Sequence, residues 1–335
     1  MTVMHRNVSI IGDGAMGTVL AMLLSEKQDP VRIWGYDARQ LADIERAREN
    51  TKFLPGHAIP ESVVFEPRDD RILQDADMVV SAVPCQYTRA IWKRLRSRFR
   101  DGVPIVSVTK GIENGTLMRP TQILADVLGP RVRCAVLSGP TIADELARRL
   151  PASACVASQD PDFAQAAQHT FNTDWFRVYT NSDVVGVEMA SACKNVIAIA
   201  AGIVDGVGAG DNAKAALLSR GLAEIGRLGI ACGARPETFA GLAGLGDLVT
   251  TCISPKGRNR SFGEQIGQGR TVGQALASTE SVVEGVATCE SVAALARLKG
   301  VEMPITEAVH QVLSEHKPVR QAIHDLMIRQ LKAES

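Results

Sequence analysis

The feature that most constrains the fold of this chain is a glycine-rich turn near its start. In the segment "VSIIGDGAMG", Gly12, Gly14 and Gly17 form a G-x-G-x-x-G pattern. The turn follows a short apolar run and precedes "AMGTVLAMLLSEK", which has the composition of a helix. A strand, a glycine turn and a helix in this order are typical of the first unit of a βαβ fold.

Each glycine has a separate physical task in a dinucleotide site. Gly12 permits the tight turn, Gly14 lets backbone N–H groups approach a pyrophosphate, and Gly17 lets the helix pack closely on the strand. The N-terminus of the helix adds unpaired donors and a positive dipole that attract the anion. Ala15 and Met16 occupy the variable places of the pattern and are expected to contribute backbone and packing. We therefore predict that all five residues contact a bound dinucleotide.

The residues after the second expected strand bear on the choice between NAD and NADP. An acidic side chain at the end of this strand would accept a hydrogen bond from the ribose 2′-hydroxyl of NAD. The strand "VRIW" continues instead as "GYDAR", so Asp37 lies beyond Gly35 and Tyr36 rather than at the strand end. Arg39 is close enough in sequence to bind the 2′-phosphate of NADP. The pattern accommodates NADP or NAD, with NADPH slightly favoured, and Tyr36 is counted as a cofactor-binding residue.

Apolar runs alternate with amphipathic segments in the first half of the chain. Strands are expected at residues 8–12, 31–34, 77–83, 104–109, 133–139, 152–158 and 175–180. Strands that alternate with helices imply a parallel, doubly wound sheet with both faces covered.

The character of the sequence changes after residue 180. No convincing strand follows, and helices are expected at residues 183–201, 211–228, 236–242, 260–267, 272–277, 285–298, 304–315 and 318–332. The predicted fold class is therefore α/β, with an N-terminal Rossmann-like doubly wound parallel sheet and an all-helical C-terminal domain. We place the dinucleotide-binding domain at residues 1–182 and the helical substrate domain at residues 183–335.

Composition argues against several classes of protein. The 37 basic and 37 acidic side chains balance, and no basic block appears, so we expect no nucleic-acid partner. The seven cysteines form no C-x-x-C pair, which argues against a disulfide framework and a zinc ribbon, and we expect no metal site. We see no secretory signal and no uninterrupted apolar stretch of membrane-spanning length. These observations favour a cytoplasmic protein with reduced thiols and no membrane insertion.

Further motifs follow the glycine turn in a fixed order. They are "VTKGIE", "LSGPTIADEL", "CKNVIAIAAGIVDG", "AGLGDLVTTC", "GRNRSFG" and "VVEGVAT". Together with "IGDGAMGTVLA" they resemble the bacterial type of NAD(P)-dependent glycerol-3-phosphate dehydrogenase over nearly the whole chain. The resemblance implies reversible reduction of dihydroxyacetone phosphate to sn-glycerol 3-phosphate for phospholipid synthesis. It also suggests a homodimer.

A related two-domain NAD(P)-dependent reductase, acting on a hydroxy acid or on ketopantoate, is the alternative. Such a substrate requires a clamp for a carboxylate. The segment "GRNR" together with Lys110 suits a phosphorylated small molecule better.

The resemblance assigns catalysis to Lys194 and Asp247. A ketone oxygen that gains negative charge during hydride transfer must be protonated or stabilised. A lysine does this best when burial lowers its pKa toward about 7–8, and the alanine-rich segment around Lys194 favours burial. Taken alone, Lys194 would also suit an exposed helix face. Asp247 is implied to hold the lysine and to contact substrate, although an Asp before "LVTTC" also suits a helix N-cap.

The substrate phosphate requires cationic and amide donors. Arg258 and Asn259 provide a guanidinium fork and an amide N–H₂ group, and they precede an expected helix. Many members of the family have serine at the next position upstream, where this chain has Gly257, so only a backbone N–H remains there. Lys110 follows a strand at the sheet edge where ligands of such folds bind, and it is implied to serve both substrate and cofactor, as is Arg258.

The remaining residues are assigned by the resemblance alone. Gly139 and Thr141 in "SGPTIA" are implied to face the substrate, and Ala143 the cofactor. Val282 and Glu284 match positions near the cofactor, and the Glu284 carboxylate is suited to accept from a ribose hydroxyl.

Overall fold

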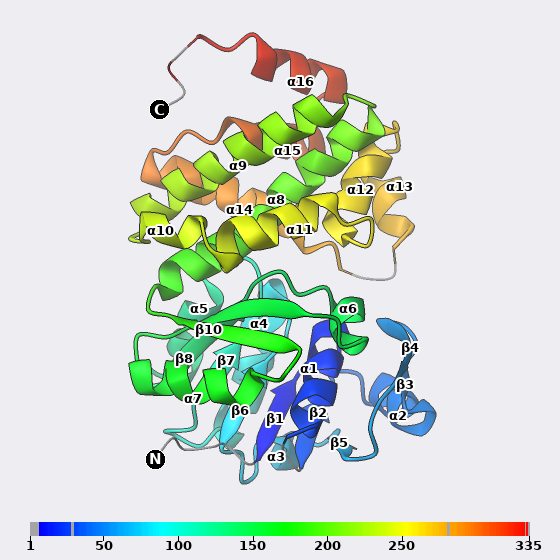
Figure 1. Cartoon of the computed structure of the whole chain (residues 1–335), viewed down its shortest axis with the longest axis vertical. Helices are drawn as coiled ribbons and strands as arrows, with labels where there is room; N and C mark the ends of the chain where they lie inside the picture. Colours follow the sequence, from blue (N-terminus) through cyan, green and yellow to red (C-terminus); the bar gives the residue numbers. More distant parts are fainter. Residues whose placement is uncertain (1–6, 28–29, 280–281, 332, 334–335) are drawn as a thin grey trace.

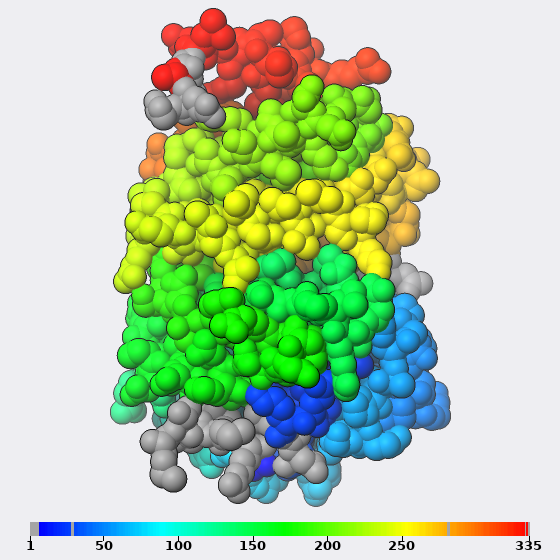
Figure 2. Space-filling model, viewed as in Figure 1, coloured from blue at the N-terminus to red at the C-terminus, as the bar shows by residue number. Residues whose placement is uncertain are grey.

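The computed structural model describes residues 7–27, 30–279, 282–331 and 333. A sheet flanked by helices forms one half of the molecule, and a bundle of helices forms the other (Figure 1). The two halves lie directly against each other in the space-filling view (Figure 2).

Within the described residues, an eight-stranded sheet organises the first half. Its spatial order is β10 (Phe176–Asn181), β9 (Ala152–Ala157), β8 (Cys134–Ser138), β7 (Ile105–Ser107), β6 (Met78–Ser81), β1 (Val8–Ile11), β2 (Val31–Trp34) and β5 (Val63–Phe65). Side chains alternate across the sheet, so Ile10 enters one apolar core and Ile11 the other. Both faces of the sheet are therefore covered, as the sequence predicted.

Helices bound these two cores. The helices of this half are α1 (Ala15–Ser25), α2 (Ala38–Ala47), α3 (Asp69–Ile72), α4 (Cys85–Leu95), α5 (Pro120–Leu128), α6 (Ala143–Ala147) and α7 (Pro161–Phe171), with a 3₁₀ turn at Arg96–Arg98. Residues of α1 and α7 pack in one core, and residues of α4 and α5 pack in the other.

The strands of this half differ from the sequence prediction in two respects, and two of them, β3 and β4, pair only with each other outside the eight-stranded sheet. The strands β3 (Glu49–Asn50), β4 (Leu54–Ala58) and β5 were missed, because they are short and "LPGHA" of β4 contains Pro and Gly. The sheet is also not wholly parallel, since β8 and β9 pair antiparallel. The helix between them, α6, has only five residues. Such a helix is about 7.5 Å long, too short to return the chain along a strand for a parallel crossover.

The second half is helical throughout its described residues. Its elements are α8 (Val184–Gly206), α9 (Asp211–Ala231), α10 (Pro236–Phe239), a π-helical turn (Leu242–Gly246), α11 (Asp247–Ile253), α12 (Arg258–Gly267), α13 (Val272–Ala277), α14 (Glu284–Lys299), α15 (Pro304–Ser314) and α16 (Val319–Met327). The sequence prediction omitted α11 and extended the last helix beyond Met327.

The central element of this half is α8, which passes between the other helices (Figure 1). By length and composition it is apolar enough to cross a membrane, yet 94% of its apolar window is buried inside the protein. It is therefore the core helix of this half.

Close packing between α8 and α12 sets the position of the "GRNR" segment. A Cβ atom on Gly202 would lie 1.9 Å from the carbonyl oxygen of Arg260, and one on Gly263 would lie 2.0 Å from that of Ile199. Both glycines are therefore needed for the two backbones to touch. This contact fixes the first turn of α12 relative to the helix that carries Lys194.

Candidate active site

The glycine turn leaves an open cradle at the start of α1. The N–H of Gly12 donates to the carbonyl of Trp34 at 2.8 Å, which ties the turn to β2. A Cβ on Gly17 would lie 1.9 Å from the carbonyl oxygen of Gly12, whereas one on Gly14 would meet nothing within 4 Å. Gly14 is the N-cap of α1 and, like any glycine, offers no side chain to the first N–H groups of the helix, which begins at Ala15. Open space beside unpaired donors fits a dinucleotide pyrophosphate.

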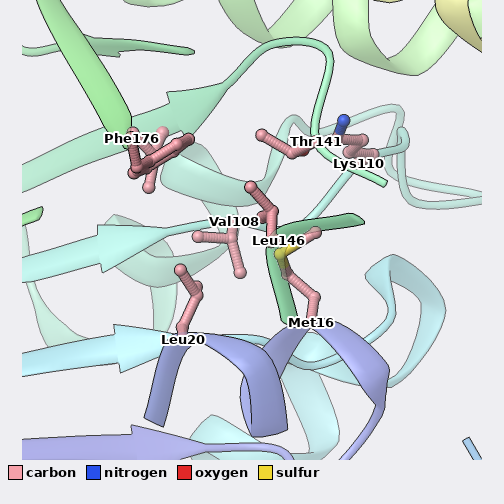
Figure 3. A pocket seen from close by; sticks show the side chains of 8 residues that line it. Met16, Leu20, Val108, Lys110, Thr141, Leu146 and Phe176 are labelled. Atoms are coloured by element: carbon pink, nitrogen blue, oxygen red, sulfur yellow. The ribbon is translucent and has the colours of Figure 1, made fainter. Parts of the chain in front are cut away.

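The side chain of Met16 packs among apolar residues and does not extend into the open space beside Gly14. Its side chain borders a small cavity together with Leu20, Val108, Leu146 and other apolar residues. Figure 3 shows Met16 and Leu20 from α1 on one side of this cavity, with Lys110 and Thr141 on the other. The apolar layer thus separates α1 from the polar sheet edge, which gives Met16 a packing role whether or not its backbone contacts a cofactor.

The centre of the site is a carboxylate held between two lysines. Lys194 donates to Oδ1 of Asp247 at 2.7 Å, and Lys110 donates to Oδ2 at 2.7 Å. Lys194 and Asp247 are only 4% and 2% exposed. Lys110 follows β7 in the sheet half, whereas the other two residues belong to α8 and α11. The cluster therefore joins the carboxyl edge of the sheet to the helical half, where ligands of open α/β sheets bind.

Asp247 does not act as the N-cap that its sequence context also allowed. It is the first residue of α11, and the cap position is Gly246. Its carboxylate instead accepts from the two ammonium groups. A π-helical turn, Leu242–Gly246, leads directly into the aspartate.

Burial and charge set the protonation states of the cluster. Burial lowers the pKa of Lys194 to about 8, while Asp247 acts in the opposite direction and Lys110 adds to the lowering. Burial tends to raise the pKa of Asp247, but the charges of Lys110 and Lys194 outweigh it and hold that pKa below its usual value. Near neutral pH the site thus holds an ionised carboxylate and a lysine poised for proton transfer.

Thr251 belongs to the same cluster and was missed from sequence. Its hydroxyl accepts a hydrogen bond from Lys194 and lies 3.4 Å from Oδ1 of Asp247. The signal was present, since Thr251 follows Asp247 by one helical turn and residues so spaced share a face. Its role is to fix the direction of the Lys194 ammonium.

The residues expected to bind the substrate phosphate and part of the cofactor lie at the starts of α12 and α14. Arg258 is exposed and donates to the carbonyl of Val282 at 3.2 Å. Asn259 accepts the N–H of Gly285 through Oδ1 at 3.0 Å, which leaves its amide N–H₂ group for a ligand. Burial raises the pKa of Glu284, against the opposing charges of Arg258, Lys110 and Lys194. Glu284 therefore lies within the electrostatic reach of both lysines.

The "SGPT" segment approaches from the sheet half. The carbonyl of Gly139 accepts from Lys110 at 3.4 Å and from the Thr141 hydroxyl at 3.1 Å. Ala143 begins α6 immediately beyond. Gly257 is the N-cap of α12, so its backbone lies beside Arg258 and Asn259.

Tyr36 lies apart from the lysine pair, beyond the end of β2. Its side chain is 71% exposed. The guanidinium of Arg94 stands over its ring at 5.4 Å from the centroid. The chain contacts the glycine turn at Trp34, two residues before Tyr36, through the bond from the Gly12 N–H to the Trp34 carbonyl.

A glycine cradle that faces a desolvated lysine across the sheet edge defines a class of protein, the oxidoreductases that depend on a nicotinamide dinucleotide. The N-terminal model of NAD-dependent glycerol-3-phosphate dehydrogenase matches residues 7–164, and the C-terminal model matches residues 183–324. The chain belongs to the NAD-dependent glycerol-3-phosphate dehydrogenase family.

Individual relatives agree with this assignment. An NAD(P)+-dependent glycerol-3-phosphate dehydrogenase of Geobacter sulfurreducens is 49% identical over 333 residues, which cover 99% of each chain. One from Chlorobium luteolum is 45% identical and covers 98% of this chain and 99% of its own. The crystal structure of glycerol-3-phosphate dehydrogenase from Coxiella burnetii superposes with a TM-score of 0.94 at 36% identity, covering 97% of this chain and 99% of that one.

Proposed function

We propose that this protein catalyses the reversible, NAD(P)-dependent reduction of dihydroxyacetone phosphate to sn-glycerol 3-phosphate, a precursor for phospholipid synthesis. The observation that carries the proposal is the buried Lys194–Asp247–Lys110 cluster at the sheet edge, with the glycine cradle at the same edge. The relatives named above carry this activity in their names. The alternative reductase for a hydroxy acid or ketopantoate is not favoured by the family assignment.

A steady-state assay tests the proposal. Dihydroxyacetone phosphate and ketopantoate are each supplied with NADH and with NADPH, and oxidation of the nicotinamide is followed. We expect turnover with the phosphorylated ketone. Turnover of ketopantoate alone would refute the assigned substrate.

The residues of the chain divide the chemistry among them. A nicotinamide dinucleotide, when bound at the glycine cradle, supplies the hydride for the ketone carbon. Lys194 holds a proton on Nζ and donates it to the ketone oxygen during reduction, and it receives that proton again during oxidation of the alcohol. Asp247 holds the ammonium in place at 2.7 Å and keeps it charged in a buried setting. Lys110 provides a second cation that stabilises negative charge on the substrate.

The lowered pKa of Lys194 predicts the pH dependence of the reaction. Its ammonium form, which reduction requires, is lost as pH rises through a value of about 8. We expect kcat/KM for reduction to fall about tenfold per pH unit above that value. Oxidation of glycerol 3-phosphate requires the neutral amine of Lys194, so its rate should fall as pH decreases below about 8. Initial rates of reduction and of oxidation over a pH series measure these two pH dependences.

We assign the substrate phosphate to Arg258, Asn259 and the Gly257 backbone at the start of α12. A guanidinium fork and an amide at a helix N-terminus match the geometry and charge of a phosphate dianion. The Arg258 guanidinium is exposed, and in the described structure it donates to a backbone carbonyl.

Arg258→Ala is therefore expected to raise KM for dihydroxyacetone phosphate strongly, by about tenfold or more, since charge-assisted hydrogen bonds each contribute roughly 1.5–3 kcal/mol. The melting temperature should change little. Arg320→Ala, an exposed arginine of α16, is the matched control. An unaltered KM in Arg258→Ala would remove Arg258 from the substrate site.

The domain division, assembly and location follow as parts of the same proposal. We propose a dinucleotide domain at residues 1–182 and a substrate domain at 183–335. The family resemblance suggests a homodimer, and exposed apolar side chains such as Leu298 and Met327 offer surface that a subunit contact would cover. The seven cysteines are free thiols, which supports a cytoplasmic location. Sedimentation of the purified protein measures the assembly.

A further inference from the structure

We propose that Asp13, inside the glycine turn, is the carboxylate that selects NAD(H) over NADP(H). The inference rests on the proposed dinucleotide-dependent function and assigns a specificity-determining residue to it. In folds of this kind, selection is made where the adenosine ribose lies, near the end of the second strand. A carboxylate there accepts from the 2′-hydroxyl of NAD and repels the 2′-phosphate of NADP.

The position immediately after β2 carries no side chain. The strand ends at Trp34, and the next residue is Gly35, which is buried. A Cβ atom on Gly35 would lie 2.5 Å from Oδ2 and 3.0 Å from Oδ1 of Asp13. The Asp13 carboxylate therefore fills the space that a side chain at the strand end would occupy. A residue of the first turn supplies the acidic group that the second strand lacks.

The surroundings of Asp13 hold it in this position. Its backbone carbonyl accepts from the amide of Asn50 at 2.8 Å, and Asn50 is fully buried. The amide of Gln40 donates to Oδ2 at 2.8 Å. In the described part of the chain, Gln40 is the one side chain that donates to this carboxylate, so Oδ1 is left to accept from a ligand. An oriented acceptor of this kind suits a ribose hydroxyl.

The other acidic candidate is already engaged. Asp37 accepts from the backbone N–H groups of Arg39 and Gln40, at 2.9 and 3.4 Å, and so caps α2. Its carboxylate is exposed and bound to the helix it begins. Asp37 is thus a structural cap, whereas Asp13 lies against the strand end.

One of the two arginines near the end of β2 is also engaged. Arg94 stands over Trp34 and Tyr36. Its guanidinium forms two hydrogen bonds with the Asp69 carboxylate, at 2.6 and 2.9 Å, which offsets its charge. Arg39 is exposed in the first turn of α2. The Asp13 carboxylate would repel a 2′-phosphate dianion at the strand end, which favours NAD, in contrast to the slight preference for NADPH that the sequence suggested. The charge of Lys52 acts on the same carboxylate and offsets part of this repulsion.

Direct binding of the cofactors to the full chain tests the inference. The Kd values of NADH and of NADPH are measured by nicotinamide fluorescence for the wild type and for Asp13→Asn, without any substrate. We expect the wild type to bind NADH more tightly. The isosteric Asp13→Asn change removes the charge, so the ratio of Kd(NADPH) to Kd(NADH) should fall by about tenfold or more. Asp37→Asn is the matched control and should leave this ratio unchanged.

Several results would overturn the inference. One is tighter binding of NADPH by the wild type. Another is an equal loss of affinity for both cofactors in Asp13→Asn at an unchanged melting temperature, which would show that Asp13 only shapes the turn. A wild-type protein that binds neither NADH nor NADPH would also contradict the inference. Because no substrate is present, failure of the dihydroxyacetone phosphate assay with intact selective binding would refute the proposed reaction and leave the role of Asp13 standing.

Discussion

Lys194→Ala is expected to lower kcat for reduction of dihydroxyacetone phosphate by about 10²–10⁴-fold, the usual contribution of a general acid. The reason is local, because Nζ of Lys194 is the buried group whose pKa of about 8 suits proton transfer. The glycine cradle belongs to the other half of the molecule, at the start of α1. The Kd of NADH should therefore stay nearly unchanged. Initial rates and fluorescence titration measure the two quantities.

Two comparisons sharpen this prediction. Lys317→Ala removes a lysine that precedes α16 and pairs with Asp325 of that helix, outside the site, and should leave kcat unchanged. Turnover of Lys194→Ala near the wild-type rate would exclude Lys194 as the proton donor. A parallel loss of NADH affinity would indicate that the variant is misfolded, and not that it lacks only the proton donor.

Asp247→Ala is expected to destabilise the protein by about 3–5 kcal/mol, the usual effect of removing one member of a buried ion pair. The carboxylate is 2% exposed and balances two ammonium groups, from Lys110 and Lys194. Without it, two cations remain close together in a desolvated site. Urea denaturation, monitored by circular dichroism, measures the free energy of unfolding.

The isosteric change Asp247→Asn separates stability from catalysis. The amide retains the shape of the side chain, but it no longer opposes the effect of burial on the pKa of Lys194. That pKa should fall further, and the reduction rate at pH 7.5 should fall with it. Asp325→Asn breaks an ion pair that is 39% exposed at the aspartate. It should leave the free energy of unfolding nearly unchanged, because exposed ion pairs contribute little. Equal small effects in both positions would contradict the buried role of Asp247.

The sequence predicted the overall architecture because its main signals are local. Apolar strands alternating with amphipathic helices, followed by helices alone, define the two halves. The antiparallel direction of β9 was not predictable in the same way, since it depends on how short α6 is when folded. The strands β3 to β5 were missed because they are short and contain exposed or turn-forming residues.

The sequence predicted the site residues that belong to its recognisable motifs. The pairing of Lys110 with Asp247 joins residues 137 positions apart, and only folding reveals that one carboxylate holds both lysines. Thr251 lies one helical turn after Asp247, and this spacing is present in the sequence, but no role for Thr251 was predicted from it. The place of Asp13 depends on a neighbour, the absent side chain at Gly35, and so could be recognised only once the turn and the strand end were placed together.

The most direct test compares the pH dependence of kcat/KM for ketone reduction in the wild type and in Lys194→Arg. The arginine keeps a positive charge, but its guanidinium stays protonated at all these pH values and so does not donate a proton. We predict that the wild-type rate falls above pH 8 and that the small residual rate of Lys194→Arg shows no such limb. An identical descending limb in both proteins would contradict the assignment of the transferred proton to Lys194.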